Sequence, residues 1–323
     1  MARKSFMYSV LEAVQYEMRQ DKNMIWIFEL TPPVASTPGK PVINLEREFG
    51  RLRVVNTGID ENWMVGCVLG AGLAGSKAVT YVPYQGACMP FQMIQNHAGK
   101  LRSMTGGDAA MPVVFIMEMT GQTPGFAGQH SDYEIDTYYA HIAGVKTVIP
   151  SNPTDAKGMM VSAIRDPNPV VFLWADGLRD MIEEVPDEQY TTPLDKAALR
   201  SEGSDITIVG SGGGMPEVLK ATEMLQKAGM KVETIDLRSL KQMDTETLVK
   251  SVQKTKRLLT VDQSYYTLCP GAEVIARVAE NVDGARYKRI AFPDAPPPAA
   301  PEMFLWMRPN ANHIVGAATK LVG

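Results

Sequence analysis

Residues 145–172 read VKTVIPSNPTDAKGMMVSAIRDPNPVVF and contain a complete strand–helix–strand unit. A β-branched run ends at Pro150, and Ser151-Asn152-Pro153-Thr154 then supplies residues that begin helices. Residues 156–164 predict a helix, and a proline-rich turn ends it before the strand VVF. Because a helix joins the two strands within so few residues, the strands are expected to pair in parallel in one sheet.

The same alternation of strands and helices extends along the rest of the chain. It predicts an α/β protein with mostly parallel sheets that helices cover on both faces. A polar stretch at residues 189–203 predicts a linker between a first domain, 1–188, and a second domain, 204–323. Residues 31–43, rich in Pro, Thr and Gly, predict a loop long enough to have a function. The other buried strands are predicted at 24–28, 53–56, 78–82, 113–117, 206–209, 232–235 and 257–261.

Composition excludes several classes of protein. The chain has 323 residues, 45% hydrophobic content and a net charge of -4, so it offers no basic face for nucleic acid. No apolar run is long enough to span a bilayer. Cys67, Cys88 and Cys269 are far apart and lack metal-ligand spacing, so we interpret them as buried small hydrophobic residues in a reducing compartment. We therefore expect a cytoplasmic protein.

Glu61 stands at a predicted strand-to-helix junction, before a glycine-rich apolar helix over residues 65–75. Free N–H groups and the positive end of the helix dipole favour a carboxylate there. On these grounds alone, Glu61 either stabilises the helix or is a functional carboxylate. The many small residues of the helix predict close packing against another helix, across a subunit interface.

Three further positions leave similar alternatives open. His130 lies in a glycine-containing loop, where a histidine is either simply exposed or functional. Tyr84 follows the strand at 78–82 and is either a core residue or a ligand contact. Free carbonyl groups at the predicted helix end attract cations, but Asp166 and Asn168 also suit a plain turn.

Nearly the whole chain resembles the β subunits of thiamine-diphosphate-dependent 2-oxo acid dehydrogenases, the decarboxylating first component of those complexes. The collinear matches include residues 145–172, Thr57-Gly58-Ile59-Asp60-Glu61, His130-Ser131 and residues 235–240. Such a subunit consists of a pyrimidine-binding, transketolase-like domain followed by a transketolase C-terminal-like domain. The resemblance therefore implies two domains, each with three α/β layers.

The resemblance also implies roles for the residues near position 60. In the family, a glutamate in a Thr-Pro-Ile-(Ser or Cys)-Glu motif contacts the coenzyme's aminopyrimidine and promotes loss of a proton from the thiazolium carbon. Glu61 matches that glutamate, and Ile59 is implied as a coenzyme contact. Gly58 and Asp60 depart from the motif, and Asp60 puts a second carboxylate beside the first.

His130 matches a family histidine that lines the substrate channel and assists acyl transfer, so the resemblance implies a catalytic role for it. Asp132 replaces a family glutamine, and a carboxylate there disfavours an anionic substrate group nearby. Tyr84 is implied as the aromatic contact of the aminopyrimidine. A gapless alignment instead puts Gly86 at that position, which would alter the coenzyme contact on this side.

Family members hold the diphosphate and magnesium on a Gly-Asp-Gly motif, which this chain lacks. The resemblance therefore implies that an α subunit carries this motif in an α2β2 heterotetramer, with thiamine diphosphate at the α–β interfaces and magnesium held by the partner. It also allows for a lipoyl acyltransferase core as a further partner and for a structural potassium ion. The residues implied for potassium are Val113, Ala163, Ile164, Asp166 and Asn168.

The first functional hypothesis is the β subunit of a 2-oxo acid dehydrogenase-like enzyme that catalyses decarboxylation and acyl transfer. A second keeps the fold and coenzyme but cleaves or forms C–C bonds in acetoin, diketones or a specialised metabolite. A third is a non-catalytic β-like scaffold. The presence of both Glu61 and His130 argues against the third.

Overall fold

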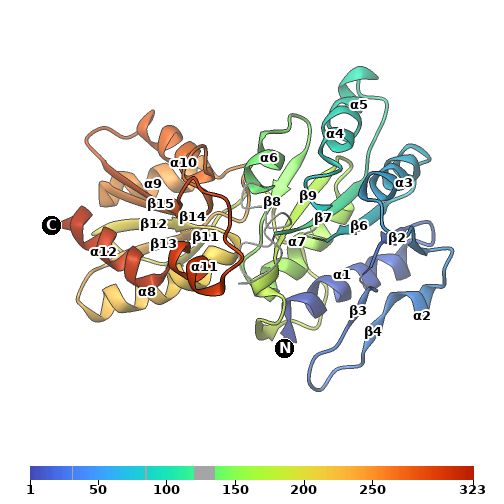
Figure 1. The fold of residues 1–323 in the computed structure, drawn as a ribbon, viewed down its shortest axis with the longest axis horizontal. Helices are drawn as coiled ribbons and strands as arrows, with labels where there is room; N and C mark the ends of the chain where they lie inside the picture. The colour runs from blue at the N-terminus through green and yellow to red at the C-terminus, as the bar shows by residue number, and fades with distance from the viewer. Residues whose placement is uncertain (31, 84–85, 120–134) are drawn as a thin grey trace.

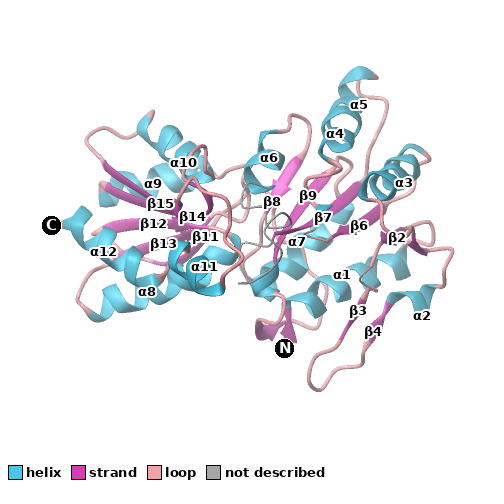
Figure 2. Cartoon of the chain, viewed as in Figure 1, coloured by secondary structure: helices cyan, strands magenta, loops and turns pink. Residues whose placement is uncertain are grey.

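The computed structural model describes residues 1–30, 32–83, 86–119 and 135–323. Two α/β units lie side by side, with the N-terminus on the first unit and the C-terminus on the second (Figure 1). A six-stranded sheet forms the centre of the first unit and a five-stranded sheet that of the second, with helices packed around both (Figure 2). The predicted fold class, two helix-covered α/β units, is confirmed.

The first sheet is entirely parallel. The strand–helix–strand unit predicted for residues 145–172 is confirmed. The strands on either side of helix α7 (Pro153–Arg165) pair in parallel, with Thr147 opposite Val171. Asn152 begins α7 by accepting a hydrogen bond from the Asp155 N–H at 2.8 Å, and Pro153 follows at the first helical position. In sheet order the strands are β5 (Val54–Asn56), β2 (Ile25–Phe28), β6 (Ala78–Val82), β7 (Val113–Met119), β9 (Val170–Ala175) and β8 (Lys146–Val148).

Two hydrophobic cores cover the faces of this sheet. One contains α7 and α1 (Phe6–Gln20), and the other contains the helices that connect the middle strands. The helical segment between β6 and β7 is interrupted by a π-helical turn over Ile94–Ala98. The connecting helices are α3 (Glu61–Leu73), α4 (Phe91–Met93), α5 (Gly99–Met104) and α6 (Ile135–His141), and a short α2 spans Leu45–Phe49.

The second sheet is parallel except at one edge. Strand β11 (Ala198–Ser201) lies inside the predicted linker and pairs antiparallel with β13, so this part of the stretch belongs to the second sheet. The division into 1–188 and 204–323 stays a proposal. The other strands are β13 (Val232–Asp236), β12 (Ile206–Gly210), β14 (Arg257–Tyr265) and β15 (Arg286–Phe292), and the helices are α8 (Met215–Lys227), α9 (Thr245–Thr255), α10 (Pro270–Ala279), α11 (Pro301–Met307) and α12 (Ala311–Val322).

Two local predictions need correction. The stretch 31–43 is not wholly a loop, since β3 (Val34–Ala35) pairs antiparallel with β4 (Ile43–Asn44). The three cysteines, all among the described residues, form no disulfide, but only Cys269 is buried, while Cys67 and Cys88 are half-buried. In the described part of the chain, no helix has the length and apolar character needed to cross a membrane.

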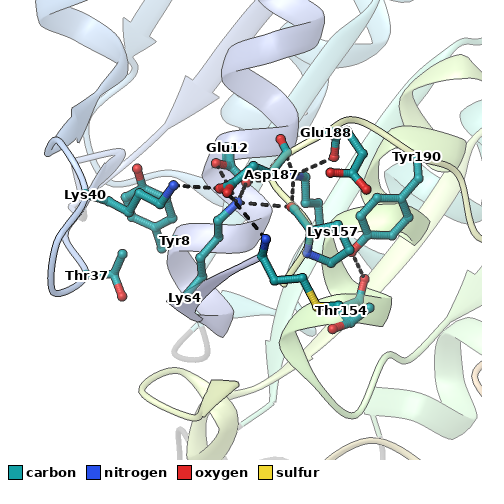
Figure 3. A network of polar contacts seen from close by, with 12 residues as sticks. Lys4, Tyr8, Glu12, Thr37, Lys40, Thr154, Lys157, Asp187, Glu188 and Tyr190 are labelled. Carbon is teal, nitrogen blue, oxygen red and sulfur yellow. Dashed lines mark hydrogen bonds and ion pairs between the residues drawn. The ribbon is translucent and has the colours of Figure 1, made fainter. Parts of the chain in front are cut away.

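A buried lysine pair fixes the N-terminus to the end of the first unit (Figure 3). Strand β1 (Ala2–Ser5) pairs with β10 (Ile182–Val185), and Lys4 and Lys157 both donate to the Glu12 carboxylate, at 2.8 and 2.9 Å. Burial lowers the pKa of Lys157, and its ammonium also donates to the carbonyl oxygen of Pro186 at 2.8 Å. The chain leaving the first unit is therefore held in a defined place.

A second cluster of charges joins the two units. Asp155, at the start of α7, accepts two hydrogen bonds from Arg238, at 2.9 and 2.6 Å, and pairs with Arg200. Arg200 also donates to the fully buried Asp236 at 2.7 Å. Beside the cluster, the Ile149 N–H donates to the Arg238 carbonyl oxygen at 2.7 Å. These contacts fix how the second sheet lies against strand β8.

Candidate functional site

The carboxyl ends of parallel strands lie at one edge of a sheet, where ligands of α/β proteins bind. Strands β5, β2 and β6 pair in register, with Asn56 opposite Phe28 and Phe28 opposite Tyr81. The residues that follow these strands therefore meet at one edge. They are Glu29 after β2, the segment 57–61 after β5, and Gly86 after β6.

Glu61 is the first residue of α3 and is half-buried. Asp60 is the N-cap, and its Oδ1 accepts a hydrogen bond from the Trp63 N–H at 2.9 Å. Asp60 is exposed and occupied with capping, so it is not a second carboxylate directed into the site. Glu61 therefore lies at the positive end of the helix without serving as its cap, and its carboxyl group is close to that of Glu29.

Glu29 is a site residue that the sequence analysis missed. Its side chain is fully buried, and its Oε2 accepts a hydrogen bond from the Asp60 N–H at 2.9 Å. Burial raises the pKa of Glu29, and the neighbouring carboxylate of Glu61 raises it further. The sequence did contain a signal for Glu29. It is an acidic residue directly after a buried strand, and a residue in that position lies at the carboxyl edge of the sheet.

Gly86 lies against the Glu61 carboxyl group. A Cβ atom added to Gly86 would lie 1.7 Å from Oε1 of Glu61, so no larger residue fits while Glu61 keeps this position. At the position that the gapless alignment assigned to an aromatic ring, the chain thus has a glycine that accommodates the carboxyl group.

Of the other residues predicted to contact the coenzyme or the substrate, only Ile59 is among the described residues. Ile59 precedes α3 and is 70% exposed, so it is accessible to a ligand or to another chain. His130 and Tyr84 lie outside the described residues, as does Asp132. Their predicted roles therefore stay predictions.

The residues predicted for potassium do lie near one another, because the Met111 N–H donates to the Pro167 carbonyl oxygen at 3.1 Å, just before Val113. However, Asp166 pairs with Lys146 and accepts two hydrogen bonds from Asn168, at 2.9 and 3.0 Å. Among the described residues, no group of three or more His, Cys, Asp or Glu side chains forms a metal cluster. A potassium ion here would depend on main-chain carbonyls such as those of Ala163 and Ile164.

Helix α6, which begins just after residues 120–134, is attached to the second unit. Thr137 Oγ1 lies 3.2 Å from Ser264 Oγ, and the buried Asp136 carboxylate accepts a hydrogen bond from the Thr137 N–H at 2.7 Å. Burial raises the pKa of Asp136 to about 7, despite a hydrogen bond with Ser264. The orientation of α6 is thus linked to a carboxyl group that titrates near neutral pH.

Stability should consequently fall as pH rises from 5 to 7. The folded-state pKa of Asp136 lies above its ordinary value of 3.8, so folding is favoured while this group stays protonated. Asp136→Asn should reduce the fall by about 2 kcal/mol, measured by urea unfolding at several pH values. Asp283→Asn, on the surface, is the control and should leave the pH profile unchanged. Equal profiles for wild type and Asp136→Asn would contradict the assignment.

Comparison with protein families identifies the architecture. The model of the transketolase pyrimidine-binding domain matches residues 8–178, and that of the transketolase C-terminal domain matches residues 195–314. The pyruvate dehydrogenase E1 component subunit beta of Rhizobium meliloti (strain 1021) is 35% identical over 98% of this chain and 69% of its own length. The chain belongs to this β-subunit family.

Other relatives give the range of activities in the family. The pyruvate dehydrogenase E1 component subunit beta of Bacillus subtilis (strain 168) is 32% identical, covering 100% of this chain and 99% of its own. The acetoin:2,6-dichlorophenolindophenol oxidoreductase subunit beta of the same organism is also 32% identical, covering 98% and 96%. The predicted resemblance to β subunits of 2-oxo acid dehydrogenases is therefore confirmed.

A solved structure has the same fold as this chain. The structure described as "Split gene transketolase, inactive beta4 tetramer" has a TM-score of 0.81 and covers 99% of both chains. Its sequence identity is 18%, so the likeness concerns the arrangement of elements alone. The family is thiamine-diphosphate-dependent, and its β subunits act with an α subunit.

Proposed function

We propose that this family member is the β subunit of a thiamine-diphosphate-dependent 2-oxo acid dehydrogenase-like enzyme and supplies the pyrimidine half of a shared active site. The supporting observation is the Glu61 carboxyl group. It is half-buried at the carboxyl edge of the first sheet, at the start of α3 and beside the buried Glu29. When bound, thiamine diphosphate supplies the electron sink that decarboxylation of a 2-oxo acid requires.

The residues at this edge suit an aminopyrimidine ring. Glu61 would contact a ring nitrogen and exchange a proton with it, and Glu29 Oε1 is buried without a hydrogen-bond partner among the described residues. Burial and the neighbouring Glu61 carboxylate raise the pKa of Glu29, which favours its protonated form. Ile59 and Tyr84 are proposed as coenzyme contacts, and His130 as the residue on the substrate side.

The second half of the site is proposed to come from an α subunit with a Gly-Asp-Gly motif, in an α2β2 heterotetramer. This chain has no such motif to hold magnesium or phosphates. Helix α3 also exposes large apolar side chains, since Trp63 is 62% and Leu73 60% exposed, and such surfaces are typical of protein interfaces. The proposal also includes a lipoyl acyltransferase core as a further partner and a structural potassium ion. A cytoplasmic location is proposed because the described cysteines form no disulfide.

A second candidate activity is the cleavage of acetoin or a diketone. It is favoured by the acetoin oxidoreductase β subunit, which is as similar to this chain as the Bacillus pyruvate dehydrogenase subunit is, at 32% identity. Both candidates use the same half-site, so the geometry of Glu61 does not separate them.

The test is co-expression with a chain that carries Gly-Asp-Gly, followed by thiamine diphosphate binding and dye-linked oxidation assays. Oxidation of 2-oxo acids supports the leading proposal, and activity restricted to acetoin or diketones supports the second. If the assembled complex neither binds the coenzyme nor turns over any of these compounds, the result would support the hypothesis of a non-catalytic scaffold. Coenzyme turnover by this chain alone would contradict the shared site.

A further inference from the structure

A large groove lies between the two units, with a volume of about 620 Å³. On the side of the first unit it is lined by Phe91 of α4 and Tyr138 of α6, whose rings pack edge to face with centroids 6.0 Å apart. On the side of the second unit it is lined by Leu240 and Leu268. Tyr138 is 41% and Leu268 75% exposed, so apolar surface remains open to solvent. We call this feature the interdomain groove.

The groove carries one uncompensated positive charge. Its ionised side chains are Lys241, Arg277 and Glu273, and Glu273 accepts a hydrogen bond from Arg277 at 2.7 Å. Lys241 is half-buried and has no ion-pair partner among the described residues. Half-burial of an ammonium group without a carboxylate is unfavourable, so an acidic group that reached Lys241 would bind well.

A short segment of the chain joins the proposed coenzyme edge to the wall of the groove. Gly86 packs on Glu61, and the segment that leads from it to α4 forms successive turns, with the Met89 N–H donating to the Gly86 carbonyl oxygen at 3.0 Å. The Tyr139 hydroxyl of α6 donates to the Ala87 carbonyl oxygen at 2.6 Å. Segment 86–91 therefore connects the surroundings of Glu61 to the wall of the groove that Phe91 forms.

Given the proposed function, a second chain must approach this edge to hold the diphosphate. We propose that a segment of this α subunit enters the interdomain groove, with an acidic side chain at Lys241 and an apolar side chain between Tyr138 and Leu268. Binding pockets are common at domain interfaces, and a few well-packed central residues carry most of the binding energy of a protein interface. The inference rests on the proposed function and names the surface that the partner uses.

Photo-crosslinking identifies what occupies the groove. Leu268 is replaced by p-benzoylphenylalanine in the complex with the Gly-Asp-Gly chain, the complex is irradiated, and the products are analysed by mass spectrometry. We expect a crosslink to a peptide of the partner that contains an Asp or Glu near an apolar residue. Crosslinks only to a second copy of this chain, or no crosslink in an assembled complex, would overturn the inference.

Charge reversal provides a second test. Lys241→Glu should weaken association with the partner at least tenfold at low salt, and its affinity should depend less on salt than that of wild type. Lys220→Glu on α8, which is exposed and does not line the groove, is the matched control and should associate like wild type. Thermal unfolding of both variants checks that they fold. Unchanged affinity of a folded Lys241→Glu chain would count against the groove.

The two proposals fail in different ways. If wild type neither assembles with a Gly-Asp-Gly chain nor binds thiamine diphosphate with it, the proposed function is wrong and the groove inference is wrong with it. If wild type assembles and binds the coenzyme while both groove tests are negative, only the groove inference is wrong.

Discussion

Replacing Glu61 by glutamine should lower turnover of the assembled enzyme by roughly 10²- to 10⁴-fold, the usual contribution of a positioned acid–base group. Glutamine keeps the length and hydrogen-bonding shape of the side chain but does not exchange a proton. Because Asp60, rather than Glu61, caps α3, the helix should stay folded and the melting temperature should change little. The measurement is steady-state kinetics of the complex at saturating coenzyme.

Two further variants distinguish loss of the Glu61 proton-transfer role from a general loss of activity. Glu223→Gln, exposed on α8, is the matched control and should keep wild-type turnover. Gly86→Ala should lower activity as well, because its Cβ would displace the carboxyl group of Glu61, while leaving the carboxylate itself present. Wild-type activity in Glu61→Gln would remove the basis of the proposed site.

Replacing Asp155 by alanine should destabilise the protein by about 3–5 kcal/mol. The change removes the carboxylate that pairs with Arg238 and Arg200 across the two units. Arg200 would keep its ion pair with Asp236, and the Arg238 guanidinium would lose the partner it has in this cluster. Breaking one member of a buried ion-pair cluster costs far more than losing a surface pair, because the remaining charges are already out of water.

Urea unfolding measures this effect, with a lower midpoint expected at an unchanged slope. Asp283→Ala, on the surface of the second unit, should shift the midpoint little. A lower slope or a second transition would instead mean that the two units of the variant unfold separately. A loss of stability below about 1 kcal/mol would show that the cluster does not hold the units together.

The sequence by itself determined the order of the elements and most of their bounds. The strand at 78–82 and the strand–helix–strand unit of residues 145–172 lie where they were predicted, because β-branched runs, caps and prolines act through neighbouring residues. The order of the motifs along the chain also indicated the family. It also placed Glu61 at a helix start, although position alone left its role open.

Only the tertiary structure decided which side chains meet. Glu29, Glu61 and Gly86 lie far apart along the chain and come together because three parallel strands end at one edge. The role of Asp60 could not be assigned from the sequence, because an aspartate at this position could be either a helix cap or a second carboxylate in the site. The hydrogen bond from the Trp63 N–H shows that it is the cap. The interdomain groove likewise depends on how the Asp155 cluster orients two sheets, a long-range packing that no local pattern encodes.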